Sequence, residues 1–298
     1  MEFEPCSGSN FRTHHVDAIS YWRPLPNYQL YHEVAVCYRF YDEVDDDFDV
    51  GVYRMRFRWE DMDPVTGIGD PFWTDNFIVP DPMEPCHDFF PDVAYDPYTS
   101  DLYLVWSRQM NYGVHPEPDA YRLHYMRFHR NTDMSGQWLG PWQAQPNSHN
   151  GWTPRIDVGT TEEMFGLPVG VNVVVGYSSQ YANDHVGFHL RANGWIAGDD
   201  GDHNTWDLDL QNPSFPLVDA GLPSVDIAPE TSETHYVAIG YIQNESLGGL
   251  EPEWGIHLWD TIGGVHDIFP DLPEDQFLYP AVAINYEEDS AVVSGFTE

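Results

Sequence analysis

Apolar and polar residues alternate along most of the chain in short runs, and this period of two predicts β-strands. The run FFPDVAYDPYTSDLYLVWSRQ, from residue 89, contains an apolar alternation, a turn and a second apolar run that ends in Trp and polar side chains. Its first strand has counterparts along the whole chain. The five first strands are HHVDAISYW from 14, PDVAYD from 91, PRIDV from 154, PSVDIA from 223 and PAVAIN from 280.

A second apolar strand follows each first strand, and its aromatic residue recurs at one late position. These aromatic residues are Tyr38, Trp106, Tyr177, Tyr241 and Phe296. A third alternating strand recurs four times, as DVGVYRMRF, AYRLHYMRF, HVGFHLRA and EWGIHLWD, and a weaker fourth strand follows near Gly and Trp. Four strands per unit at a long period predict an all-β fold, a β-propeller built of four-stranded blades. A β-sandwich is the alternative, but it does not require the same strand pair five times.

We expect a single propeller domain over residues 1–298, built of successive repeat units. The units span about 14–80, 87–146, 150–210, 219–272 and 278–298. The fifth unit is incomplete, because the sequence stops directly after its second strand. Either an N-terminal strand closes a ring of five units, or the chain is a fragment of a longer propeller of six or seven blades.

Three motifs resemble the sialidase-like, BNR-type propeller repeats of many secreted bacterial proteins. They are the P-x-V-A first strand, the V-W-S second strand and the G-x-W turn into the fourth strand, and together they cover most of the chain. The resemblance implies a propeller whose first strands surround a central channel. It does not imply sialidase activity, because the family's Asp-box, S-x-D-x-G-x-x-W, is absent. Only Arg39 and Arg108 occupy repeat positions expected to face the channel mouth, so the family's arginine triad is not placed.

Charge excludes several classes of partner. The chain has 49 acidic residues against 12 basic ones, and its formal net charge of −37 repels nucleic acids and anionic membrane surfaces. The acidic composition is typical of salt-adapted, halophile-like surfaces, and cation binding is the alternative explanation. With 42% hydrophobic residues among 298, the chain can still bury a substantial core.

Cysteine usage and the N-terminal residues bear on compartment. Cys6 and Cys86 each follow Glu-Pro, so either they form a disulfide or they remain thiols, whereas Cys37 lies in an apolar run and is expected to be a core thiol. The first ten residues contain no apolar leader, and no apolar run is long enough to span a membrane. We expect an extracellular or cell-surface protein without membrane insertion.

Polar side chains come directly after the recurrent aromatic residues of the second strands. A flat apolar ring beside amide or guanidinium donors suits a sugar, so these positions form a candidate ligand site. The candidate residues are Trp106, Arg108, Gln109, Tyr177, Gln180, Tyr241 and Gln243. The alternative is that the aromatic residues simply fill the core between blades.

Catalysis requires a base close to a proton donor or to a second carboxyl group. Histidine and acidic side chains precede the first strands, and the candidates for such a site are His87, Asp88 and His149, with Tyr112 as a possible acid. No motif fixes their spacing, so the sequence favours a function other than an enzyme.

Two acidic loops offer oxygen ligands at alternate positions, a spacing that suits calcium. The first loop contains Asp45, Asp47 and Asp49, and the second contains Asp200, Asp202 and Asn204. Calcium is therefore the one cofactor that the sequence suggests.

Three functions remain open from the sequence alone. The first is a secreted or cell-surface scaffold that binds or displays, with a glycan or a protein as ligand. The second is a carbohydrate-active enzyme, a polysaccharide lyase or glycoside hydrolase, with His and Asp at the channel mouth. The third is a structural repeat unit, as a homo-oligomer or in a larger extracellular assembly.

Overall fold

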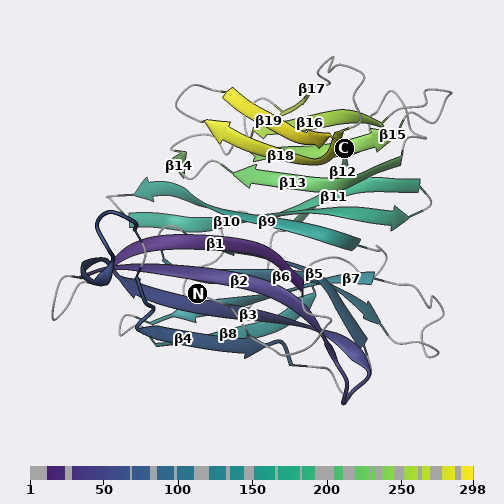
Figure 1. Cartoon of the computed structure of the whole chain (residues 1–298). Helices are drawn as coiled ribbons and strands as arrows, with labels where there is room; N and C mark the ends of the chain where they lie inside the picture. Colours follow the sequence, from purple (N-terminus) through teal and green to yellow (C-terminus); the bar gives the residue numbers. More distant parts are fainter. Residues whose placement is uncertain are drawn as a thin grey trace.

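The structure, a computed structural model, describes most of the 298-residue chain (Figure 1). The described residues are 12–23, 29–67, 69–80, 86–96, 99–110, 121–131, 135–143, 151–164, 167–181, 183–191, 205–210, 219–227, 230–231, 237–244, 252–260, 264–268, 277–285 and 290–297. Apart from the short 3₁₀ helix η1 (Trp59–Asp61), their regular structure is entirely β. The all-β prediction is therefore confirmed.

The strands form five sheets that follow one another in chain order, and within each sheet consecutive strands pair in antiparallel fashion, apart from the short strand β14 (Glu230–Thr231). The first sheet contains β1 (Arg12–Arg23), β2 (Gln29–Asp42), β3 (Asp47–Arg58) and β4 (Trp73–Ile78). The second contains β5 (Cys86–Tyr95), β6 (Leu102–Met110), β7 (Tyr121–Arg130) and β8 (Gly136–Gln143). The predicted units of four strands are confirmed here as antiparallel four-stranded sheets.

The remaining sheets repeat this order with two variations. The third contains β9 (Gly151–Met164), β10 (Leu167–Tyr181), β11 (Asn183–Arg191) and β12 (Thr205–Leu210), and the short β14 (Glu230–Thr231) pairs with β9 in parallel. The fourth contains β13 (Asp219–Ile227), β15 (Val237–Asn244), β16 (Pro252–Asp260) and β17 (Gly264–Ile268). The fifth contains only β18 (Phe277–Asn285) and β19 (Ser290–Thr297) among the described residues.

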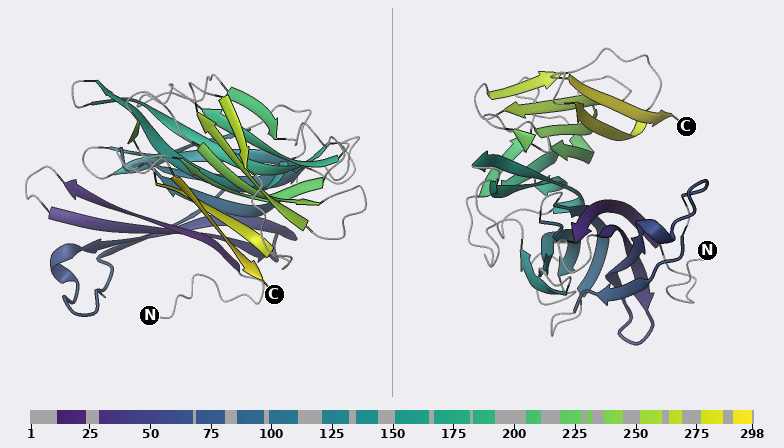
Figure 2. Two further views of the ribbon diagram at one scale, coloured as in Figure 1. Left: turned by 90° about the horizontal axis from the view of Figure 1, so that it is seen from above. Right: turned by 90° about the vertical axis from the view of Figure 1, so that its left-hand side faces the viewer.

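The first strand of each sheet lies beside the first strand of the next sheet. The contacting pairs are β1 with β5, β5 with β9, β9 with β13 and β13 with β18. Figures 1 and 2 show the resulting succession, with the first sheet at one end and the fifth at the other. In the part of the chain that the structure describes, no strand of the first sheet pairs with a strand of the fifth.

One hydrogen bond from a backbone N–H to a side chain crosses each of these four boundaries. The donor and acceptor pairs are Tyr95 to Asp17 (2.7 Å), Ile156 to Asp92 (3.0 Å), Ile227 to Asp157 (2.8 Å) and Val282 to Ser224 (3.2 Å). All eight residues belong to first strands. A short side chain with an oxygen acceptor therefore joins each first strand to the next.

Among the residues whose side chains are described, the core forms two layers, one between the first and second sheets and one between the second and third. Ala35, Cys37 and Val52 pack against Leu104 and Trp106 in the first layer. The second layer joins the other face of β6 to β9 and β10. Alternation along β6 explains this, because successive side chains of a strand face opposite sides of its sheet.

The recurrent aromatic residue of the second strand lies opposite a glycine of the third strand in three sheets. Register pairs Tyr38 with Gly51, Tyr177 with Gly187, and Tyr241 with Gly255. A Cβ on Gly51 would lie only 2.5 Å from Oη of Tyr38, so the tyrosine side chain occupies the space over the glycine. In the first sheet, the aromatic and the glycine form one packing unit.

Candidate functional site

A pocket of about 410 Å³ lies between the outer strands of the first and second sheets. Its walls come from β3, β4, β7 and the start of β8. The residues that line it are Arg54, Arg56, Trp73, Asp75, Asn76, Phe77, Phe128, Ser135, Gly136, Gln137 and Trp138. Aromatic rings, guanidinium groups and polar side chains thus share one cavity.

Stacking fixes the aromatic walls. Trp138 stacks on Phe77 across the boundary between the two sheets, with ring centroids 4.5 Å apart and an interplanar angle of 19°. The guanidinium of Arg56 lies 3.8 Å from the ring centroid of Trp73, and that of Arg54 lies 3.7 Å from the centroid of Phe128. Cation–π contacts of this kind stabilise both partners and limit the movement of the rings.

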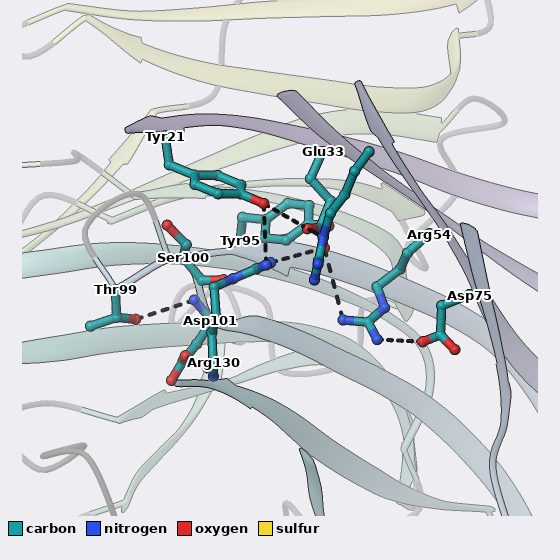
Figure 3. Close-up of polar contacts among 10 residues, drawn as sticks. Tyr21, Glu33, Arg54, Asp75, Tyr95, Thr99, Ser100, Asp101 and Arg130 are labelled. Atoms are coloured by element: carbon teal, nitrogen blue, oxygen red, sulfur yellow. Dashed lines mark hydrogen bonds and ion pairs between the residues drawn. The ribbon is translucent and has the colours of Figure 1, made fainter. Parts of the chain in front are cut away.

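Glu33 of β2 is buried, and its carboxylate pairs with the arginines of the pocket (Figure 3). Its Oε2 accepts a hydrogen bond from Nε of Arg56 at 2.6 Å. Its Oε1 lies 2.9 Å from Nη2 of Arg130, which comes from β7 of the second sheet, and 3.8 Å from Nη1 of Arg54. One carboxylate therefore links three guanidinium groups from two sheets.

Two tyrosines complete the environment of Glu33. The hydroxyl of Tyr95 donates to Oε1 at 2.9 Å, and the hydroxyl of Tyr21 donates to Oε2 at 3.2 Å. Burial by itself would raise the pKa of Glu33, but the guanidinium groups of Arg130 and Arg56 outweigh it and lower the pKa to about 2. Burial raises the pKa of both tyrosines, and the carboxylate beside them raises it further. At neutral pH Glu33 is an anion that accepts from two neutral phenols.

The pocket contains more hydrogen-bond donors than its own acceptors satisfy. Nη2 of Arg54 donates to the carboxylate of Asp75, but Nε and Nη1 of Arg54 have no hydrogen-bond acceptor among the described residues. The indole Nε1 of Trp138 is also buried and has no hydrogen-bond acceptor among the described residues. Buried donors without acceptors are rare in folded proteins, and bound water or a ligand commonly accounts for them. These atoms have almost no accessible surface, so they belong to the packed wall of the pocket and do not face its open space.

The candidate ligand residues of the second strands lie inside the fold where their side chains are described. Trp106 is fully buried and Tyr177 is nearly so, and both pack in the core layers. Arg108 forms two hydrogen bonds of 2.7 Å with Asp88, and both side chains are buried, as is Gln109. Gln180 lies on β10, and Tyr241 and Gln243 lie on β15, where the backbone alone is described.

The catalytic candidates are only partly visible. His87 accepts a hydrogen bond at its Nδ1 from the backbone N–H of Phe48, at 3.2 Å, and Asp88 beside it is paired with Arg108. His149 and Tyr112 lie outside the described residues. The grouping of the four candidates therefore stays a prediction.

The first acidic loop is described, and the second is not. Asp45 is exposed in the turn between β2 and β3, whereas Asp47 and Asp49 are buried at the start of β3. In the described part of the chain, no three His, Cys, Asp or Glu side chains gather as a metal site would require. Asp200, Asp202 and Asn204 lie outside the described residues, and calcium binding stays a prediction.

The cysteines and the membrane prediction are described in part. Cys37 and Cys86 are both buried, and Cys6 lies outside the described residues, as does any disulfide that involves it. Within the ranges that the structure describes, none of the helices has the length and apolarity needed to cross a membrane.

The sequence patterns did not reveal the residues that build this pocket, although one signal was present. Along β2 the buried face contains Tyr31, Glu33, Ala35 and Cys37, so Glu33 is a carboxylate at a position where the alternation calls for an apolar residue. A charge at such a position indicates a buried ion pair. Its partners could not be read from the pattern, because two of the three arginines alternate along β3 and the third belongs to another sheet.

Comparison with known proteins finds a distant likeness in structure and none in sequence. No model of a known protein family matches the chain, and no curated protein matches it in sequence. The chain is similar to a solved structure named Hadza microbial sialidase Hz136, with 10% sequence identity and a TM-score of 0.37. The match covers 85% of this chain and 58% of that one, so this chain spans little more than half of the sialidase's length.

Proposed function

We propose that the chain is a β-propeller scaffold that binds a carbohydrate in the pocket between its first two sheets. The propeller arrangement is supported by four-stranded sheets in chain order whose first strands lie side by side. The hydrogen bond that crosses every boundary between first strands supports it as well. Each sheet of a propeller packs against the next in this way.

The observation that carries the ligand class is that two indole rings, of Trp73 and Trp138, line one cavity together with two arginines, Arg54 and Arg56. A sugar ring has an apolar face that packs on an indole and hydroxyl groups that exchange hydrogen bonds at its edge. Asn76 and Gln137 line the same pocket and can both donate and accept.

Binding is favoured over hydrolysis by the number of carboxyl groups in the pocket. Glycoside hydrolases use two of them, one on each side of the scissile bond. Among the described residues that line the pocket, only Asp75 carries a carboxyl group, and it is paired with Arg54. Glu33 is fully buried behind the arginines and stays ionised, so it is a poor proton donor.

A glycan array followed by isothermal titration calorimetry tests the proposal. The wild-type protein should bind a defined group of glycans, and Trp138→Ala should weaken the binding at least about tenfold, the effect expected for loss of one aromatic platform. The matched control is Trp59→Ala, because Trp59 is 62% exposed and lies outside the pocket. The proposal is wrong if no glycan binds, or if both variants bind equally well.

A further inference from the structure

The first sheet has one face that no other sheet covers among the described residues. Its contacts with other sheets are chiefly to β5, and its core residues Ala35 and Val52 face the second sheet. The opposite face, the far face, is turned away from the second sheet, and Figure 2 shows the first sheet at one end of the succession. Strand register places on the far face Val16, Ala18, Val34, Val36, Met55 and Ile78.

Repeat position shows what the far face is built to contact. The residues that match Val16 in the next two sheets are Val93 and Ile156, which are 0% and 5% exposed. Val93 packs against the first sheet and Ile156 against the second, so the preceding sheet covers each of them. Val16 itself is 53% exposed. The far face is therefore the face that, in the later sheets, packs against a preceding sheet.

The second strands show the same relation. Val34 and Val36 of β2 lie four and two residues before the recurrent aromatic residue Tyr38, and Val34 is half-buried. At the matching positions of the next two sheets, the side chains are buried in the core layers toward the preceding sheet. These side chains are Leu102 and Leu104 of β6, and Val173 and Val175 of β10. The far face thus has the apolar residues of a boundary between sheets and no sheet opposite them among the described residues.

Charge separates the far face from the rest of the chain. By register, the described residues on it are every second residue of 16–20, 30–38, 51–57 and 74–78, and they include no Asp, Glu or Arg. In the whole chain 49 of 298 residues are acidic. A partner with carboxylates opposite this face would bury them without an ion pair, which is strongly unfavourable. The partner surface therefore has to be uncharged as well.

We infer that the far face binds the same face of a second copy of this chain, around a two-fold axis. The partner has to be a sheet that is uncharged and wide enough to cover four strands, and the far face itself is both. The fifth sheet presents only two strands among the described residues, so it is too narrow for this. A two-fold axis places one patch opposite itself, and the contact closes with two copies. The pocket lies on the other side of the first sheet, so this inference does not rest on the proposed function.

Net charge makes this dimer depend on salt. Each copy carries a formal charge of −37, so two copies repel each other at long range. The Debye length falls from about 30 Å at 0.01 M salt to about 3 Å at 1 M, whereas the burial of apolar surface needs no ion pairs. Salt should therefore favour this dimer, although it weakens an interface that ion pairs hold together.

Sedimentation equilibrium of the full chain between about 0.05 M and 2 M NaCl tests the inference. Val16→Asp places two carboxylates in the contact, one from each copy, and should weaken dimerisation at least about tenfold. Ile78→Asp, on β4 of the same face, should do the same. The matched control is Val44→Asp, because Val44 is 88% exposed in the turn between β2 and β3 and the variant gains the same charge. Unfolding midpoints establish which variants are folded.

The inference predicts a single species of two chains at high salt and its dissociation at low salt. It also predicts weaker dimerisation in the folded far-face variants and unchanged dimerisation in Val44→Asp. A monomer at every salt concentration overturns the inference, as does assembly beyond two chains or equal dimerisation of the far-face variants and Val44→Asp. These outcomes leave the proposed glycan binding standing, because the glycan array measures it separately.

Discussion

The backbone N–H of Ile156 donates a hydrogen bond of 3.0 Å to Oδ2 of Asp92, across the boundary between the second and third sheets. Asp92 is buried, and its Oδ1 also contacts Nδ1 of His15 on the first sheet. That contact is the main reason why the pKa of His15 is raised. A single aspartate on β5 therefore links three consecutive sheets.

Replacing Asp92 should weaken the packing of these sheets. Asp92→Ala leaves the N–H of Ile156 buried without an acceptor, a change that costs about 1–3 kcal/mol in free energy of unfolding. Asp92→Asn retains a carbonyl oxygen at the same place and should cost less. Chemical denaturation with urea, followed by tryptophan fluorescence, measures both changes.

The surface variant Asp70→Ala gives the baseline, because substitutions at exposed positions usually change stability by less than about 0.5 kcal/mol. Equal unfolding free energies for Asp92→Ala and Asp70→Ala would show that the bond between Asp92 and Ile156 contributes nothing to stability.

The buried Glu33 makes stability depend on pH in the acidic range. Its pKa in the folded state is about 2, below the ordinary value of 4.5, so its contribution is complete above pH 4.5 and is lost as the pH falls toward 2. The loss amounts to about 3 kcal/mol by linkage. Thermal unfolding between pH 2 and pH 6 measures it.

Glu33→Gln tests the origin of this pH dependence. The variant leaves Arg54, Arg56 and Arg130 without their shared anion, so it should be destabilised at neutral pH by about 3–5 kcal/mol. Its stability should also vary less with pH between 2 and 4.5 than that of the wild type. If the stability of Glu33→Gln changes with pH between 2 and 4.5 as much as that of the wild type, other carboxyl groups cause the pH dependence.

Strands and sheet order followed from local pattern, because the alternation of apolar residues depends only on which face of a strand is buried. The first strands predicted from residues 91, 154 and 223 begin within β5, β9 and β13. The glycine opposite Tyr38 was also present in the sequence, as the recurrent Gly of the third strand. Its role in packing could be recognised only from the strand register, which places it opposite the tyrosine.

The pocket did not follow from the sequence, because it depends on how two sheets pack against each other. Trp73 and Trp138 belong to different sheets, and Glu33 meets Arg130 across the same boundary. The pattern of the second strands instead pointed to Trp106, which is completely buried in the core. Repeat position predicts what a residue packs against within its own sheet, and it is silent on the contacts between outer strands.

The pairing of Gly51 with Tyr38 predicts intolerance of the smallest added side chain. Gly51→Ala places a methyl group 2.5 Å from Oη of Tyr38, and this hydroxyl is held by Asn76 at 2.6 Å. Overpacking of this kind costs about 1–3 kcal/mol. Urea denaturation of Gly51→Ala, Tyr38→Ala and the double variant measures the coupling between the two sites. If the two effects are simply additive, the tyrosine does not confine the glycine.

Asp157 on β9 and Asp226 on β13 form a carboxyl pair, which should make stability depend on pH in the opposite direction to Glu33. Burial, and then a hydrogen bond with Asp226, raise the pKa of Asp157 well above 3.8. The folded state therefore keeps a proton that the unfolded state has released, and stability falls as the pH rises from about 3.8 through the folded pKa.

Asp157→Asn mimics the protonated form at every pH and still offers an oxygen to the N–H of Ile227. It should raise the free energy of unfolding at pH 7 by about 0.5–2 kcal/mol and remove this part of the pH dependence. Urea denaturation of the variant and the wild type at pH 4 and pH 7 measures both effects, with Asp70→Asn as the control. A loss of stability at pH 7 with an unchanged slope would mean that the pair is ionised in the folded protein and that Asp157 stabilises it as an anion.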